Sequence, residues 1–268
     1  FKLVTAAAAL ASGRFTPESV LPGPAEYDLP LSDRTLRNWT GEPCGPGGEV
    51  TLIEALAQSC NTAFAWLGNE LGADALRTQS QAFGFDTAFN IPLRASTSRF
   101  PDNPDAPQTA ISAIGQFDVR ATALQMAMVA AGIGNNGIVM EPYLVQELRG
   151  PDLSILRTTT ASEFGAAMSS QNAADLIEMM VAVVERGTAS VLRGVTTAEG
   201  QSVRVGAKTG TAQTSADRPS VAWMVALAPA TNPQIAVAVV VEDGGQNEIS
   251  SNAIAGPIAR AVIEAALR

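Results

Sequence analysis

Residues 203–213, with the sequence VRVGAKTGTAQ, bring together several groups that suit the recognition of a carboxylate. The alternating valines predict a short β-strand, and glycine within a strand often marks a place where the backbone of a ligand comes close. Lys208 supplies a cation, while Thr209 and Thr211 supply two hydroxyl groups around a bare glycine backbone. This segment therefore predicts a binding site for a peptide that carries a carboxylate. The alternative is that Lys208 is an ordinary solvated lysine at the end of a strand.

Lysine is rare in this chain, whereas arginine is not. Lys2 and Lys208 are the only lysines among the 17 basic residues. The amine of a lysine can be made neutral and can then act as a base, whereas the guanidinium of arginine stays charged. Histidine is absent, which excludes Ser-His-Asp and Cys-His nucleophiles and most catalytic zinc sites. Serine or threonine with lysine as the base is the covalent chemistry that remains.

The composition is that of a globular chain with a core of its own. The 268 residues are enough for one large or two small domains, and 46% of them are hydrophobic. No apolar run reaches the length that crosses a membrane. The net charge of −9 argues against nucleic acid or an anionic lipid surface as the main partner. Cys44 and Cys60 have no metal-binding spacing, and they either form a disulfide or remain two thiols.

The predicted helices lie mostly in the first two thirds of the chain, and the predicted strands lie in the last third. Helical periodicity, capping boxes and helix-ending glycines predict helices over residues 1–11, 51–58, 62–71, 73–83, 122–133, 171–186 and 253–267. Strands are predicted over 203–213, 221–227 and 235–241, with extended chain over 138–149. The wholly apolar strand 235–241 is expected to be covered on both faces. Irregular chain is predicted over residues 16–48 and 86–107. This order argues for an α+β fold in which helices pack on an antiparallel sheet.

Ser59 and Asn61 lie in the short connection between two predicted helices. On a regular helix, residues two positions apart do not share a face. In a short connection, both side chains could point into one cleft. The alternative is an ordinary break between helices, since serine and asparagine both compete with the helical backbone for hydrogen bonds.

Three motifs occur in a defined order along the chain. Lys208, Thr209 and Gly210 form Lys-Thr-Gly, and Ser59-Cys60-Asn61 forms Ser-x-Asn. Phe1-Lys2 is similar to the end of Gly-Ser-Thr-Phe-Lys, a form of the Ser-x-x-Lys motif. Three further stretches contribute to the resemblance described next: IGQFDVRATALQMA at 114–127, GTA at 187–189 and AWMVALAP at 222–229. Together they resemble the transpeptidase domain of class B penicillin-binding proteins, and the resemblance covers essentially the whole chain.

The resemblance implies an α+β fold with an antiparallel sheet flanked by helices and an all-helical subdomain. Residues 1–268 would be the C-terminal part of the transpeptidase domain. The nucleophilic serine would lie two positions before Phe1, and a membrane anchor and a pedestal domain would lie further upstream. We therefore expect this sequence to be a fragment that does not acylate by itself. The protein is expected at the extracytoplasmic face of the cell membrane.

The resemblance also implies a role for each catalytic residue. Lys2 would be the general base, because burial and the nearby positive charge of Lys208 would both lower its pKa. Ser59 would relay a proton to the leaving amine. Asn61 would hold a peptide bond of the substrate. Lys208 would supply positive potential and anchor the hydroxyl of Ser59.

Substrate binding is expected along the Lys-Thr-Gly strand. Thr209 and Thr211 would bind the terminal carboxylate beside Gly210. The backbone N–H of Thr211 would form half of an oxyanion hole, and the N–H of the upstream serine would form the other half. On an ideal strand, Lys208 faces one way while Thr209 and Thr211 face the other. The four residues would therefore need a twisted strand to point into one cleft.

The implied reaction is D,D-transpeptidation, in which stem peptides of peptidoglycan are cross-linked and β-lactams trap the serine. No metal or cofactor is implied, and proteins of cell division or elongation are further candidate partners. A D,D-carboxypeptidase is the nearest alternative, because only the acceptor differs. A serine β-lactamase is another, although no Glu-x-x-Leu-Asn segment occurs and 149 positions separate Ser59 from Lys208. A non-catalytic β-lactam or muropeptide sensor or binding domain is the alternative outside enzymes.

Overall fold

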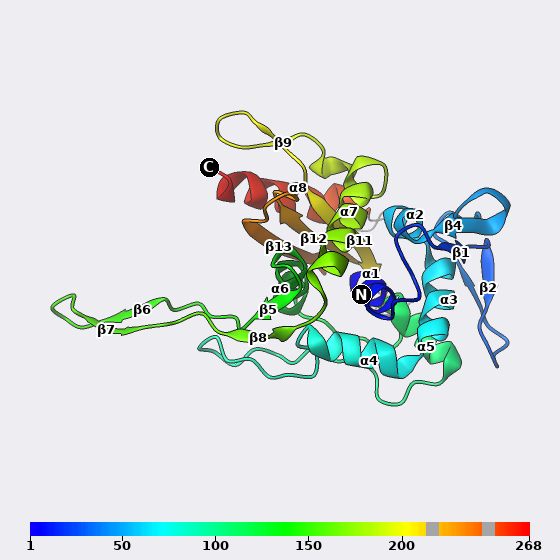
Figure 1. Ribbon diagram of the computed structural model, residues 1–268, viewed down its shortest axis with the longest axis horizontal. Helices are drawn as coiled ribbons and strands as arrows, with labels where there is room; N and C mark the ends of the chain where they lie inside the picture. Colours follow the sequence, from blue (N-terminus) through cyan, green and yellow to red (C-terminus); the bar gives the residue numbers. More distant parts are fainter. Residues whose placement is uncertain (213–219, 243–249) are drawn as a thin grey trace.

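The computed structural model describes residues 1–212, 220–242 and 250–268 and confirms an α+β fold (Figure 1). Among these residues, the central sheet has three antiparallel strands in the order β11-β12-β13. They are β11 (Gly206–Ala212), β12 (Val221–Ala228) and β13 (Ile235–Val241). These strands match the three predicted ones closely, apart from the start of β11. The predicted end of the first strand, Gln213, lies outside the described residues.

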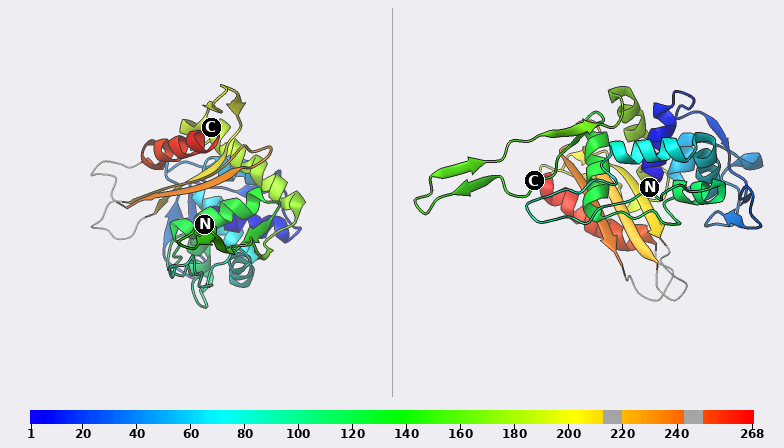
Figure 2. Two further views of the ribbon diagram at one scale, coloured as in Figure 1. Left: turned by 90° about the vertical axis from the view of Figure 1, so that its left-hand side faces the viewer. Right: turned by 90° about the horizontal axis from the view of Figure 1, so that it is seen from below.

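Helices cover both faces of this sheet. α8 (Ser251–Ala266) packs on one face, and α6 (Ala123–Gly134) and α7 (Ser170–Glu185) pack on the other (Figure 2). The central strand β12 is largely buried, as its sequence VAWMVALA requires. Strand β13 has helices on both faces as predicted, but most of its residues are only half-buried. The reason is that, in the described sheet, β13 pairs along one edge only.

The alanine-rich helix α1 (Lys2–Ala11) runs through the middle of the molecule. Every residue from Lys2 to Leu10 is buried, because small alanine side chains let other helices approach closely on all sides. The neighbours of α1 are α2 (Leu52–Ala57), α3 (Asn61–Leu71), α4 (Ala73–Ala82) and α7. α5 (Ala106–Ala113) packs against α3 and was missed by the sequence analysis, although Asp105 and Gln108 form a complete capping box at its start.

In both predicted capping boxes the N-cap hydrogen bond is present, but the reciprocal hydrogen bond from the third side chain is absent. The hydroxyl of Thr51 accepts a hydrogen bond from the N–H of Glu54 at 3.4 Å, and that of Thr122 accepts one from Gln125 at 3.1 Å. The side chains at the third position do not reach back. The carboxylate of Glu54 instead binds Arg186 at 2.6 Å, and the amide of Gln125 donates to the carbonyl of Phe83, at the end of α4, at 2.7 Å. Tertiary partners have displaced the local ones.

Short strands surround the central sheet. Residues 16–48 contain β1 (Val20–Pro22), β2 (Glu26–Asp28) and β3 (Thr35–Arg37), and β1 pairs with β4 (Glu49–Thr51). The predicted strand 203–213 is interrupted, since β10 (Ser202–Val203) pairs with β9 (Val195–Thr196) before β11 begins.

The predicted extended segment 138–149 is divided between two hairpins. β5 (Ile138–Met140) pairs with β8 (Glu163–Ala166), and β6 (Glu147–Arg149) pairs with β7 (Ile155–Thr158). The second hairpin extends far from the body of the molecule (Figure 1). Within the described ranges, no helix combines the length and the apolar character needed to cross a membrane.

Candidate active site

A cleft of about 1580 Å³ lies where the helical part of the molecule meets the edge of the sheet. Its walls come from the start of α1, the α2–α3 connection, strand β11 and the start of α8. All seven predicted site residues line it: Lys2, Ser59, Asn61, Lys208, Thr209, Gly210 and Thr211. Four segments that are far apart in the sequence therefore meet in one cavity.

Lys2 is held in the first turn of α1 with its amine directed at the α2–α3 connection. Its side chain is buried, and Nζ donates to the carbonyl of Ser59 at 2.6 Å and to Oδ1 of Asn61 at 2.8 Å. The same nitrogen lies 3.2 Å from Oγ of Ser59. Burial, and then the positive charge of Lys208, hold the pKa of Lys2 well below its usual value. Lys2 is thus set up to be a neutral amine.

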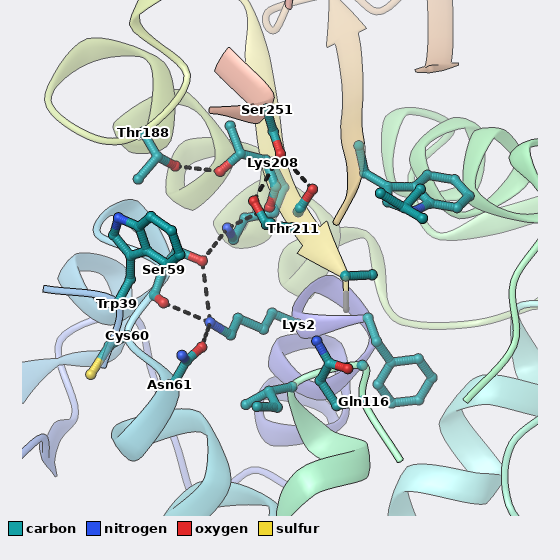
Figure 3. A pocket seen from close by; sticks show the side chains of 18 of the residues that line it. Lys2, Trp39, Ser59, Cys60, Asn61, Gln116, Thr188, Lys208, Thr211 and Ser251 are labelled. Atoms are coloured by element: carbon teal, nitrogen blue, oxygen red, sulfur yellow. Dashed lines mark hydrogen bonds between the residues drawn. The ribbon is translucent and has the colours of Figure 1, made fainter. Parts of the chain in front are cut away.

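The hydroxyl of Ser59 lies between the two lysines of the chain (Figure 3). Nζ of Lys208 donates to Oγ of Ser59 at 2.8 Å and to the carbonyl of Thr209 at 2.9 Å. Burial lowers the pKa of Lys208 to about 7. A hydroxyl that touches two amines, one of them neutral, can accept a proton from one side and donate one to the other.

An unusual backbone conformation turns Ser59 into the cleft. Its φ is 60°, in the left-handed region that residues other than glycine seldom adopt. The N–H of Ser59 donates to Leu56, and the N–H of Cys60 donates to Ala55 at 2.8 Å, which closes the end of α2. The chain then enters α3 at Asn61. Both Ser59 and Asn61 consequently reach Lys2, so the break between helices also serves to build the cleft.

The two cysteines form a disulfide, which decides between the alternatives left by the sequence. Cys44 and Cys60 are joined by a bond of 2.04 Å and are 16 positions apart. Closing a loop of this length stabilises the folded state by about 3 kcal/mol in the chain-entropy model. Because Cys60 is the middle residue of Ser59-Cys60-Asn61, the bond also ties this motif to the loop that follows β3.

The hydroxyls of strand β11 are bonded to residues that the sequence analysis did not single out as site residues. Oγ1 of Thr209 lies 2.6 Å from Oγ1 of Thr188, and Oγ1 of Thr211 lies 3.0 Å from Oγ of Ser251. Ser251 also donates to the carbonyl of Gly210 at 2.6 Å. The lysine amine of this strand meets Ser59 while the two threonine hydroxyls meet other partners, as strand alternation requires.

A glycine places Thr188 beside this strand. A Cβ on Gly187 would lie 2.1 Å from the carbonyl oxygen of Ala57, so only glycine permits this approach. The N–H of Thr188 donates to the same carbonyl at 3.2 Å. The end of α7 is thereby fixed against the end of α2, two residues before Ser59. The GTA stretch at 187–189 was the available signal for Thr188, whereas nothing in the sequence pointed to Ser251.

Exposed aromatic groups stand at the open side of the cleft. Trp39 is 74% exposed and Phe117 is 55% exposed, and both line the cavity. Phe117 has a φ of 62°. Large exposed apolar side chains beside a polar cavity provide contact area for a bound molecule. The sequence analysis did not identify either residue.

Comparisons with known proteins show the family of this chain. A family model described as "Penicillin binding protein transpeptidase domain" matches residues 1–264. The peptidoglycan D,D-transpeptidase PbpA of Mycolicibacterium smegmatis is 46% identical over 275 residues, which cover 100% of this chain and 54% of that protein. PbpA of Mycobacterium tuberculosis is 44% identical, with the same coverage. The chain thus spans about half the length of the curated relatives it matches.

Solved structures show the same relationship. The ceftriaxone acyl-enzyme complex of penicillin-binding protein A from M. tuberculosis aligns with a TM-score of 0.93 and 43% identity, covering 100% of this chain and 59% of that one. A D,D-transpeptidase domain from Eggerthella lenta aligns with a TM-score of 0.85 and 29% identity, covering 99% of this chain and 64% of that one. The chain belongs to the penicillin-binding protein transpeptidase domain family.

Proposed function

We propose that this chain is the catalytic part of a peptidoglycan D,D-transpeptidase, which cross-links stem peptides by serine acyl transfer. The observation that carries the proposal is the hydroxyl of Ser59, held 2.8 Å from the amine of Lys208 and 3.2 Å from that of Lys2. The names of the relatives support it: PbpA of two mycobacteria is a peptidoglycan D,D-transpeptidase. Penicillin-binding protein A has been solved as acyl-enzymes with ceftriaxone, imipenem and penicillin G.

The proposed nucleophile is a serine two positions before Phe1. Residues three positions apart on a helix are neighbours on one face, so a serine there would lie one turn from Lys2. The lowered pKa of Lys2 supports its assignment as the base, because a neutral amine is needed to accept the proton of the serine hydroxyl. Burial of the amine is thus a functional feature of α1 as well as a structural one.

In acylation, the serine oxygen attacks the carbonyl carbon between the two D-alanines while Lys2 takes its proton. The negative charge that develops on the carbonyl oxygen is stabilised by the N–H groups of the serine and Thr211. The carbon–nitrogen bond then breaks, and the proton passes from Lys2 through Ser59 to the leaving amine of D-alanine. An ester to the serine remains. In the second half, an amine of a neighbouring stem attacks this ester and the serine regains its proton.

Substrate recognition is assigned to strand β11 and the start of α3. Thr209, Thr211 and the backbone at Gly210 bind the terminal carboxylate, with Lys208 as the nearest cation. Asn61 binds an amide of the stem peptide or of a β-lactam side chain. Its two ends face Lys2 at 2.8 Å and the carbonyl of Arg37 at 3.2 Å, so its orientation is fixed before substrate arrives. Such preorganisation lowers the cost of binding.

The proposed place of action is the extracytoplasmic face of the cell membrane. The disulfide between Cys44 and Cys60 supports this location, because disulfides persist in oxidising compartments. Stem peptides of the wall are the proposed substrates and β-lactams are the proposed inhibitors. Proteins of cell division or cell elongation, which work on the same wall, are the proposed protein partners.

The test is to give the full-length protein an acyl-D-Ala-D-Ala peptide together with an amine acceptor. We expect D-alanine to be released and a new amide to form between donor and acceptor, both measured by mass spectrometry. Pretreatment with benzylpenicillin should abolish both products. Release of D-alanine with only the hydrolysed donor would instead indicate a D,D-carboxypeptidase. A folded protein that releases no D-alanine would contradict the proposal and favour a sensor or binding domain.

A further inference from the structure

Helix α3, which carries Asn61 at its start, is capped by a residue from a distant part of the chain. Its own N-cap residue, Cys60, makes no side-chain capping hydrogen bond and is held in the disulfide. Oδ1 of Asn38 instead accepts hydrogen bonds from the N–H of Asn61 at 2.9 Å and from that of Thr62 at 3.1 Å. These are two of the N–H groups that a helix start leaves without an internal partner.

The amide nitrogen of Asn38 also has two backbone hydrogen-bond partners. Nδ2 donates to the carbonyl of Pro24 at 2.9 Å and to that of Glu42 at 3.0 Å. Backbone N–H groups on one side and backbone carbonyls on the other allow only one orientation of this amide. Asn38 is 7% exposed, which means that water cannot easily replace these partners. Asn38 therefore joins α3 to the loops at residues 24 and 42.

The connection that Asn38 makes between α3 and these loops acts directly on Asn61, whose amide is assigned to substrate binding. Asn61 contributes the first N–H of α3, and its side chain reaches Lys2 in one direction and the carbonyl of Arg37 in the other. Arg37 precedes Asn38 in the chain, so one short segment holds both the backbone and the side chain of Asn61. A shift of α3 relative to this segment would move the Asn61 amide relative to Lys2.

We propose that Asn38 is a positioning residue for acyl transfer: by capping α3 from the β3 loop, it sets where the Asn61 amide meets the substrate. This rests on the proposed function and adds to it a residue outside the three motifs. Asn38 lines the cleft but is not assigned a contact with the reacting atoms. Its effect on the rate is expected to pass through Asn61 alone.

The test is a double-mutant cycle in the full-length protein, read as the second-order rate constant for acylation by benzylpenicillin. Asn38→Leu keeps the number and branching of the side-chain heavy atoms but removes the cap, and misplacement of a site group by an ångström can cost roughly 10²-fold. We expect a loss of that size in the parent background. In an Asn61→Ala background, the same change should cost less than about threefold, since coupled residues are not additive.

Two further variants separate positioning from stability. Asn38→Asp keeps the oxygen that caps α3 but sets its second oxygen against the carbonyls of Pro24 and Glu42, so we expect a lower melting temperature. Because the cap remains, we expect the acylation rate of the folded variant to stay within about fivefold of the parent. Gln79→Leu is the matched control: Gln79 is a buried amide that donates to Ala167 at 2.8 Å outside the cleft. It should lower the melting temperature without changing the acylation rate.

Several outcomes would overturn the inference. Parent-like acylation of the Asn38→Leu variant would do so, and so would a loss in the Asn61→Ala background as large as in the parent. The Asn38→Asp result does not depend on whether the leucine variant folds. If the folded aspartate variant lost as much acylation as complete removal of the Asn61 amide, capping would not be the cause. If the full-length parent is not acylated at all, the proposed function fails as well. If the parent is acylated but the variants give the contradicting results, only the role of Asn38 fails.

Discussion

Replacing Lys208 with methionine is expected to slow acylation of the full-length protein by benzylpenicillin roughly 10²–10³-fold, the usual cost of losing one preorganised electrostatic group. Lys208 donates to Oγ of Ser59 at 2.8 Å and is the cation of the strand assigned to the substrate carboxylate. Methionine fills a similar volume, so the cavity left by a smaller residue is avoided. The second-order rate constant of acylation is the measurement. A rate close to that of the parent would contradict the role given to Lys208.

The stability of the same variant provides its control. Burial lowers the pKa of Lys208 from 10.5 to about 7, so between these pH values the unfolded chain binds more protons than the folded one. Stability from this group therefore rises as the pH rises through that window, and it is lowest at and below pH 7. We expect the methionine variant, which has no such charge to bury, to melt at pH 7.5 no earlier than the parent. A much lower melting temperature would mean that the lost acylation reflects poor folding.

Replacing Lys2 with methionine is expected to slow acylation by about 10⁴-fold, at the upper end of the range for general-base catalysis. The amine is buried in the first turn of α1, one helical turn from the position of the proposed serine. The pH dependence of the parent tests the same assignment. Burial, and then the charge on Lys208, lower the pKa of Lys2, and the proposed mechanism requires Lys2 to lose its proton before Lys208 does.

The active state is then the one with neutral Lys2 and positive Lys208. The rate constant for the free enzyme should rise with pH as Lys2 loses its proton and fall again as Lys208 does so near pH 7. A Lys208→Arg variant keeps its charge at higher pH, so its profile should lack the falling limb even if its rate is lower. A parent profile that is flat from pH 5 to pH 9 would contradict the assignment of the two lysines.

Local signals in the sequence located most of the elements that carry the site, whereas the resemblance to a known family was needed to assign Ser59 and Asn61 to it. Thr51 and Thr122 marked helix starts, Gly72 marked a helix end, and strand alternation located β11. The scarcity of lysine drew attention to Lys2 and Lys208, and both line the cleft. Apart from the lysine count, which is a property of the whole composition, these signals depend on residues within a turn or a strand of one another, the range over which sequence patterns are informative.

Contacts between distant segments could not be predicted in the same way. The hydroxyl of Thr211 meets Ser251, which is 40 positions away, and Asn38 caps a helix 23 positions further along the chain. The sequence also left the pairing of Cys44 and Cys60 open. Each of these contacts depends on how separate elements pack, and no periodicity within one element encodes it.

The backbone at Ser59 is a further feature that the sequence conceals. A left-handed residue at the end of a helix is usually glycine, because other side chains raise the energy of that conformation. Here serine adopts it with a φ of 60°. The strain is opposed by the closing hydrogen bonds of α2 and by the disulfide at Cys60. Local propensity therefore gives way to function at the centre of the cleft, where such departures are expected.

The most direct test of serine acyl transfer at this site is an intact-mass time course of the full-length protein with benzylpenicillin, followed by peptide mapping. We expect a single covalent adduct of the whole drug that persists for hours, located on a serine two residues before Phe1. An adduct that forms and then disappears with turnover of the drug would indicate a serine β-lactamase instead. A folded protein that gains no adduct, or gains it on a different residue, would contradict the mechanism assigned to Lys2, Ser59 and Lys208.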